Sequence, residues 1–163
     1  MIKLASVVSI SLLLGACSLN VPGLTSATNT PLEIKGYHIG DSVSVCPNKE
    51  KIYEKEKILI CEARITSIAN ETTKSSKLYF YDGKLAYIHI DMNQQQGFNQ
   101  YNVLSALTQK FGPPAQGGVP RTHIWTNGKN LMALDEIKGT LLLAGENAGK
   151  IQISLSAQDS KDL

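Results

Sequence analysis

The chain has 163 residues, of which 42% are hydrophobic, and its 16 basic and 14 acidic residues leave a formal net charge of +2 at pH 7. Nucleic-acid binding calls for a basic patch or stripe, so this nearly neutral balance disfavours a nucleic-acid partner. Without the leader and tether described below, about 125 residues remain, which suits a single domain with one modest core.

Residues 1–16 have the composition of a secretory signal. Lys3 gives a charged start, an apolar run of about eleven residues follows, and small residues precede Cys17. The run is too short to cross a bilayer, which requires roughly twenty apolar residues. The sequence Leu14-Gly15-Ala16-Cys17 resembles the lipobox of bacterial lipoproteins. This resemblance implies cleavage before Cys17, diacylation of its thiol and acylation of the new amino group. In the alternative interpretation, the signal is an ordinary one and Cys17 is incidental.

A triacylated Cys17 would hold the protein at a membrane without a spanning helix, because two or more acyl chains give stable attachment. Under the sorting rule of enteric bacteria, Ser18 in the second mature position implies the outer membrane. We therefore expect a lipid-anchored outer-membrane protein that faces the periplasm. Residues 17–33 are rich in Ser, Thr, Asn, Gly and Pro without a hydrophobic period, which predicts a flexible tether.

The folded part is expected at residues 34–157, followed by a polar tail at 158–163. Near its start, Asp41 is placed to cap a short helix that ends before Pro47. The alternating charges of residues 48–57 predict a solvated face or loop. Residues 58–69 predict a strand with a bulge.

Cys46 and Cys61 are left as an even pair once Cys17 carries the lipid. In an oxidising compartment such a pair forms a disulfide by default. Closing a loop of about fifteen residues stabilises a fold by roughly 3 kcal/mol in the chain-entropy model. Redox-active pairs usually have Cys-x-x-Cys spacing, so we interpret this pair as structural.

Residues 78–81 and 84–92 predict the clearest hairpin, with Asp82-Gly83 between them. A two-residue turn would pair Phe80 with Leu85, whereas a three-residue loop would pair Phe80 with Lys84. We prefer the three-residue loop because it gives a cleaner core side. In that register one face carries Leu78, Phe80, Ala86, Ile88 and Ile90, and the other carries Tyr79, Tyr81, Leu85, Tyr87 and His89.

Residues 98–111 predict the best helix, with Asn99 as its cap and Gly112-Pro113 at its end. Its inward stripe is formed by Leu104, Leu107 and Phe111. A loop is expected at 116–120. Turn signals then separate four predicted strands, at 123–126, 131–137, 140–144 and 151–155.

This order of elements predicts an α+β domain, with an antiparallel meandering sheet and one long and one short helix on one face. The run formed by residues 78–90, residues 98–113 and Trp125 resembles small periplasmic domains of bacterial lipoproteins, including the outer-membrane assembly type called SmpA or BamE. The resemblance lies in the pattern of residues 34–130. It implies a fold, and no functional residue is carried over from it.

The sequence contains no Gly-x-Ser-x-Gly elbow and no phosphate-binding loop. His38, His89 and His123 are isolated and lack the spacing of metal ligands. We therefore expect no cofactor, no metal and no enzymatic activity. The enzymatic alternative would rest on His89 and Asp91, which share a strand face and could transfer a proton.

The best candidate for a binding surface is the strand face with Tyr79, Tyr81, Tyr87 and His89. Tyrosines are enriched at interfaces, and an exposed cluster would bind an envelope protein or a glycan. The more frequent arrangement is that a helix or C-terminal strand covers such residues as a second core layer. We expect a non-catalytic lipoprotein that binds another envelope component. The alternatives are an inhibitor of a cell-wall hydrolase and an envelope enzyme acting on peptidoglycan or lipid.

Overall fold

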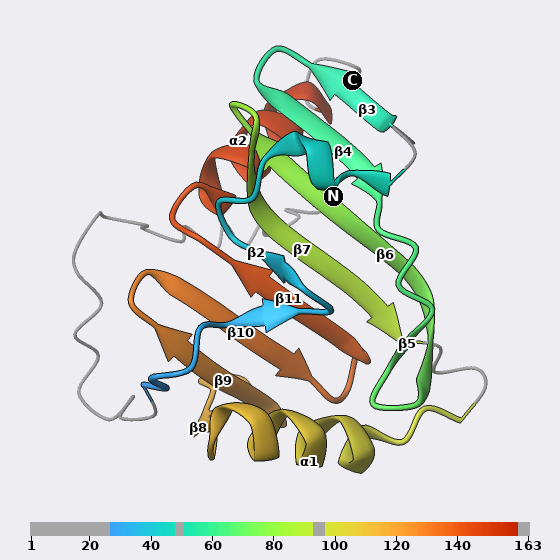
Figure 1. The fold of residues 1–163 in the computed structure, drawn as a ribbon, viewed down its shortest axis with the longest axis vertical. Helices are drawn as coiled ribbons and strands as arrows, with labels where there is room; N and C mark the ends of the chain where they lie inside the picture. The colour runs from blue at the N-terminus through green and yellow to red at the C-terminus, as the bar shows by residue number, and fades with distance from the viewer. Residues whose placement is uncertain (1–26, 48–50, 93–96, 160–163) are drawn as a thin grey trace, which may run out of the picture.

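The computed structural model describes residues 27–47, 51–92 and 97–159. The predicted signal at 1–16, Cys17 and the first part of the predicted tether lie outside the described residues, as do residues 160–163. The described chain forms an α+β domain around an antiparallel sheet, as the sequence predicts (Figure 1).

Within the described residues the large sheet has the strand order β3-β4-β6-β7-β11-β10-β9-β8, with β5 paired to β6. The chain enters this sheet at the edge strand β3 and passes through β4 and β6 to β7. It then follows α1 (Gln100–Phe111) to the far edge at β8 and returns through β9 and β10 until β11 pairs with β7. A separate ribbon joins β1 (Glu33–Ile34) to β2 (Tyr37–His38). The strands of the large sheet are β3 (Lys51–Lys55), β4 (Ile58–Glu62), β5 (Ser67–Ile68), β6 (Glu71–Tyr81), β7 (Lys84–Met92), β8 (Ala115–Gln116), β9 (Thr122–Asn127), β10 (Asn130–Asp135) and β11 (Thr140–Ala144).

The long predicted helix is present as α1 (Gln100–Phe111), and Asn99 caps it by accepting a hydrogen bond from Tyr101 N at 3.1 Å. The short predicted helix is the single 3-10 turn η1 (Val43–Val45). Its cap is Ser42 rather than Asp41, because the Asp41 carboxylate instead accepts a hydrogen bond from His38 N at 2.7 Å. Among the described residues, neither α-helix is long and apolar enough to span a membrane.

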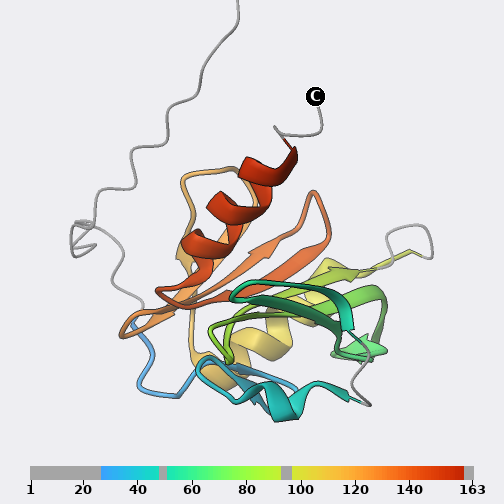
Figure 2. The ribbon, with the colours of Figure 1, turned by 90° about the horizontal axis from the view of Figure 1, so that it is seen from above.

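The main core lies on one side of the sheet, which we call the inner face. Leu78, Phe80, Ile88 and Ile90 of β6 and β7 are almost fully buried there. The helix α1 covers this core with the buried side chains Val103, Leu107 and Phe111. The ribbon β1–β2 and η1 lie on the same side as α1 (Figure 2). Both predicted helices therefore share one face, as expected.

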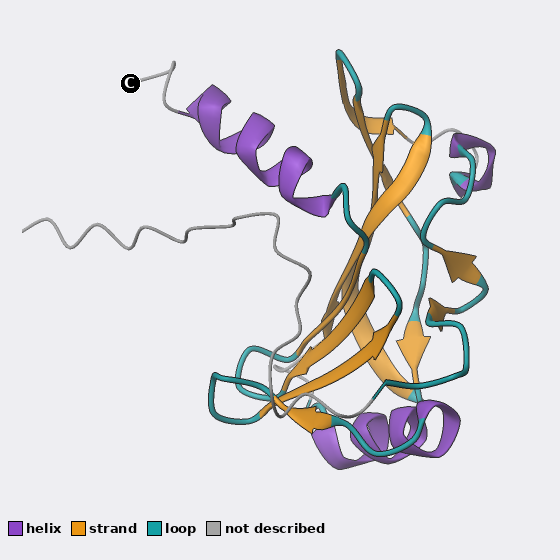
Figure 3. Cartoon of the chain, turned by 90° about the vertical axis from the view of Figure 1, so that its left-hand side faces the viewer, coloured by secondary structure: helices purple, strands orange, loops and turns teal. Residues whose placement is uncertain are grey.

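A third helix, α2 (Ala148–Asp159), lies on the opposite side of the sheet (Figure 3). The sequence prediction of a strand at 151–155 is wrong. The alternating pattern suggested a strand, but β7 and β10 already occupy both sides of β11, so the chain that follows has no neighbouring strand to pair with. As a helix, the segment buries Ile151 and leaves Ile153 68% exposed.

The preferred register of the β6–β7 hairpin is also wrong. Phe80 pairs with Leu85 across a two-residue turn in which Asp82 and Gly83 both have positive φ, at 52° and 75°. A bulge at Ala86 then shifts the register. Because of this bulge, Leu85 joins the inner core and Ala86 the opposite face, the reverse of the prediction. The other predicted faces of this hairpin are confirmed.

The folded domain begins before residue 34, so the predicted tether at 17–33 is too long. Thr28 N donates a hydrogen bond to Thr126 O at 2.9 Å, beside the bridge between Ala27 and Thr126. Leu32 is 2% exposed and belongs to the main core. Apolar burial and backbone pairing therefore hold the chain against the domain from residue 27 onward.

Candidate functional site

The sheet places all four predicted patch residues on the face opposite α1, and three of them follow one another along it. Residues directly opposite each other in antiparallel strands point to the same side. Tyr79 pairs with Tyr87 in this way, and their ring centroids are 5.0 Å apart. The ring of His89 follows at 6.3 Å from that of Tyr87. The prediction that these three side chains share a face is confirmed.

The same face continues across the C-terminal strands with aliphatic side chains. His89 pairs with Leu142 of β11, and further across the sheet this row leads to Ile124 of β9. In the adjacent row, Tyr87 pairs with Ala144, which in turn pairs with Leu131 of β10. We call the six half-buried residues of this band the open face: Tyr79, Tyr87, His89, Ile124, Leu131 and Leu142.

The helix α2 covers one end of this side of the sheet. Ile151 is 2% exposed and packs with Ile58 and Ile60 of β4, beside Ala86. Tyr79 and Tyr81 both pack against this cluster, and Lys150 Nζ lies 5.2 Å from the ring centroid of Tyr81. Tyr81 therefore belongs to the small second core, as the alternative interpretation expected of such residues, and Tyr79 lies where this core borders the open face.

The aromatic groups of the open face are uncharged at neutral pH. Burial, with a smaller effect of Tyr79, raises the pKa of Tyr87 to about 12. Burial and the nearby Glu62 carboxylate raise the pKa of Tyr79. Burial lowers the pKa of His89. The nearby Asp91 carboxylate raises this pKa, and the charge of Lys77 lowers it. The face thus presents neutral hydrogen-bonding groups within an apolar surface.

The predicted pairing of His89 with Asp91 would supply the acid–base pair of an enzyme. In the structure the Asp91 carboxylate lies 3.8 Å from Lys74 Nζ, with which it forms an ion pair. Across the strands, the residue opposite His89 on β6 is Lys77, and the residue opposite it on β11 is Leu142. His89 is therefore flanked across the sheet by a lysine on one side and a leucine on the other.

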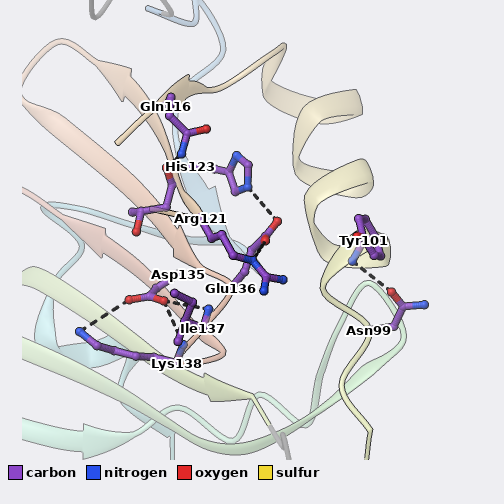
Figure 4. Close-up of polar contacts among 10 residues, drawn as sticks. Asn99, Tyr101, Gln116, Arg121, His123, Asp135, Glu136, Ile137 and Lys138 are labelled. Atoms are coloured by element: carbon purple, nitrogen blue, oxygen red, sulfur yellow. Dashed lines mark hydrogen bonds and ion pairs between the residues drawn. The ribbon is translucent and has the colours of Figure 1, made fainter. Parts of the chain in front are cut away.

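A second polar cluster lies where β9 meets the end of β10 (Figure 4). The Glu136 carboxylate accepts a hydrogen bond from Arg121 Nε at 2.9 Å, and its other oxygen lies 2.8 Å from His123 Nε2. Burial alone would raise the pKa of Glu136, but the hydrogen bonds from Arg121 and His123 outweigh burial and lower it. This cluster could not be predicted from the sequence, because Glu136 follows Arg121 by 15 residues and His123 by 13.

The cluster connects the start of β9 with the end of β10. Glu136 N also donates to Arg121 O at 3.1 Å, so backbone and side chain both link the two segments. The neighbouring Asp135 carboxylate accepts hydrogen bonds from the amides of Ile137 and Lys138, at 3.0 and 2.9 Å, and stabilises the turn before β11. We interpret the cluster as structural.

Cys46 and Cys61 form the predicted disulfide. Their Cα atoms are 6.2 Å apart, within the usual range for a disulfide. Cys61 is fully buried in β4, so the bond fastens the segment after η1 to the main core. Within residues 27–47, 51–92 and 97–159, no three His, Cys, Asp or Glu side chains are grouped so that they could hold a metal ion.

The fold is that of a small α+β domain whose antiparallel sheet has one fully packed face and one partly covered face. Residues 36–143 match the TP0088 domain, and the chain belongs to this family. The match runs from the start of β2 almost to the end of β11, and α2 lies beyond it. No curated protein and no solved structure matches the chain.

Proposed function

We propose that the protein is a non-catalytic lipoprotein, anchored through Cys17 at the outer membrane and facing the periplasm, that binds another envelope protein. The lipobox-like sequence before Cys17 supports the anchor. The short distance in sequence between Cys17 and the ordered residue Ala27 would keep the domain close to the membrane. The binding surface would be the open face.

The observation that carries this proposal is the composition of the open face. A band of half-buried aromatic and aliphatic side chains runs across five adjacent strands, from β6 to β9. Tyrosines and large aliphatic groups gain the most from leaving water when a partner covers them. A contiguous apolar band on a soluble domain is typical of an interaction surface.

The mixture of side chains favours a protein partner over a glycan. Sugars bind by stacking on exposed aromatic rings and by hydrogen bonds to polar groups. Half of the open face, however, is aliphatic: Ile124, Leu131 and Leu142. The neutral state of His89 and Tyr87 also suits an uncharged apolar partner segment, because no buried charge would need a counterion.

Site-specific photo-cross-linking in cells tests this proposal. A benzoylphenylalanine placed at Leu142 lies on the open face, and one placed at Tyr101 lies on the exposed side of α1, where the native side chain is 70% exposed. We expect discrete adducts of one envelope protein from position 142 and none of that protein from position 101. When Tyr87→Ala is added to the variant with benzoylphenylalanine at position 142, the yield of the adduct should fall.

Two results would contradict the proposal. The first is the absence of a discrete adduct from position 142 in cells that contain the full-length anchored protein. The second is an adduct of equal yield from both positions, since a specific surface must distinguish the open face from α1. A melting curve of each purified variant confirms that the domain remains folded.

A further inference from the structure

A cavity of about 590 Å³ lies at one end of the domain, away from the open face. It is bounded by η1, by the turn between β3 and β4, and by the turn between β6 and β7. Sites for small molecules commonly have volumes of about 300 to 1,000 Å³. The size of the cavity therefore suits a small organic ligand.

Hydrogen bonds and a covalent link hold the walls of this cavity in place. Val43 N donates to Gly83 O at 3.1 Å, which joins η1 to the β6–β7 turn. Asp82 N donates to Lys57 O at 2.7 Å, which joins the two turns to each other. The disulfide between Cys46 and Cys61 connects the end of η1 to β4. A preformed cavity of this kind binds with little loss of conformational entropy.

Part of the lining of the cavity is apolar. Its lining includes Leu59, which is 8% exposed, and Cys46 of the disulfide. Val43 also lines the cavity and, although it is a large apolar residue, remains 37% exposed. These side chains would gain contacts from the apolar part of a ligand.

Among the described residues that line the cavity, acidic side chains outnumber basic ones. The acidic residues are Glu54, Glu56 and Asp82, and the basic residues are Lys51 and Lys57, which leaves a net charge of −1 for this described part of the lining. Both lysines form ion pairs within the rim, Lys51 with Glu54 at 2.6 Å and Lys57 with Asp82 at 3.7 Å. The surplus carboxylate favours a positively charged group at the mouth of the cavity.

We propose that this cavity binds a small amphipathic amine, with its apolar body against Val43 and Leu59 and its ammonium group at the acidic rim. The site is separate from the open face and does not depend on the function proposed above. The two sites lie on different elements, so one can be disabled by mutation while the other remains intact.

Two matched probes test the proposal with the purified domain: a dansyl-labelled long-chain amine and the dansyl-labelled fatty acid of the same chain length. We expect fluorescence enhancement with the amine at lower probe concentrations than with the acid. Val43→Asp should weaken binding of the amine about tenfold, because it places a charge in the apolar part of the lining. Val119→Asp is the control, since Val119 is 59% exposed and lies in the loop after β8.

The substitution Glu56→Gln tests the charge of the rim separately. It should weaken binding of the amine about two- to fivefold and leave binding of the acid unchanged or stronger. Three results would overturn the proposal: no enhancement with the amine, equal affinity for the two probes, or equal effects of Val43→Asp and Val119→Asp. Because Glu56 is solvent-exposed, its variant keeps the test decisive even if Val43→Asp unfolds the domain.

Discussion

At the scale of single residues, burial determines the charge of His89 on the open face. Its pKa is lowered chiefly because the protonated, charged ring is less well hydrated in its half-buried position than it would be in water. In the unfolded chain the ring has its ordinary pKa of 6.5. The folded state therefore binds this proton less readily than the unfolded state, and protonation favours unfolding.

This difference predicts a pH-dependent stability. Well above pH 6.5 the ring is neutral in both states, and its contribution to stability is complete. As the pH falls below 6.5, the unfolded chain takes up the proton first and stability is lost. The melting temperature of the wild type should fall more between about pH 7.5 and about pH 5.5 than that of His89→Gln. The same substitution at His38, whose side chain is 50% exposed, controls for loss of a histidine. Parallel falls for wild type and His89→Gln would contradict the prediction.

The disulfide gives a second prediction at this scale. Cys46→Ala should lower the free energy of unfolding by roughly 3 kcal/mol, the value expected for a closed loop of about fifteen residues. Thermal melting with and without a reductant checks this value. The wild type should melt at a lower temperature in reductant, and the variant should melt at the same temperature in both buffers. An unaltered melt of the variant in oxidising buffer would show that the bond adds no stability.

At the scale of elements, local signals predicted α1 well and α2 badly. The cap Asn99, the buried stripe and Gly112 all lie within or next to α1, so the sequence alone defines that helix. The alternating segment at 151–155 is compatible with either a strand or a helix. Which one forms depends on whether a strand edge is free next to β11, and that is set by distant pairing. The bulge at Ala86 also involves a residue that is distant in the chain, because Ala86 O accepts a hydrogen bond from Gly145 N at 3.0 Å.

The helical state of α2 predicts unequal effects of two neighbouring isoleucines. Ile151 is 2% exposed, and Ile151→Ala should cost about 2 to 4 kcal/mol of stability through the cavity it leaves. Ile153 is 68% exposed, and Ile153→Ala should change stability by less than about 0.5 kcal/mol. In a strand these two residues would point to the same side. Equal losses in denaturant unfolding would therefore contradict the helix.

At the scale of the whole molecule, the candidate site joins parts that only the tertiary fold brings together. The alternation of β6 and β7 was sufficient to place Tyr79, Tyr87 and His89 on one face. Sequence reasoning could not add Leu142 or Leu131, because the pairing of β11 with β7 closes a loop that includes α1 and three strands. Nor does the sequence indicate that Ile151 of α2 belongs to the small cluster against which Tyr79 and Tyr81 pack.

The proposed anchor predicts where the whole protein is found in the cell. Cys17→Ser should move the protein from the membrane fraction to the soluble fraction, because the acyl chains would no longer be attached. Metabolic labelling with a clickable palmitate analogue provides the direct readout. The wild type should incorporate the label and the variant should not. An unlabelled wild-type protein would contradict the anchor, and unchanged sedimentation of the variant would point to another mode of attachment.

The sharpest measurement for the proposed binding surface is the affinity of the purified domain for the protein that is cross-linked from position 142. Leu142→Lys places a charge in the middle of the open face, whereas Tyr101→Lys places the same charge on the exposed side of α1. Titration calorimetry should show that Leu142→Lys weakens binding at least about tenfold and that Tyr101→Lys changes it less than about twofold. Equal affinities of the two folded variants would contradict docking at the open face.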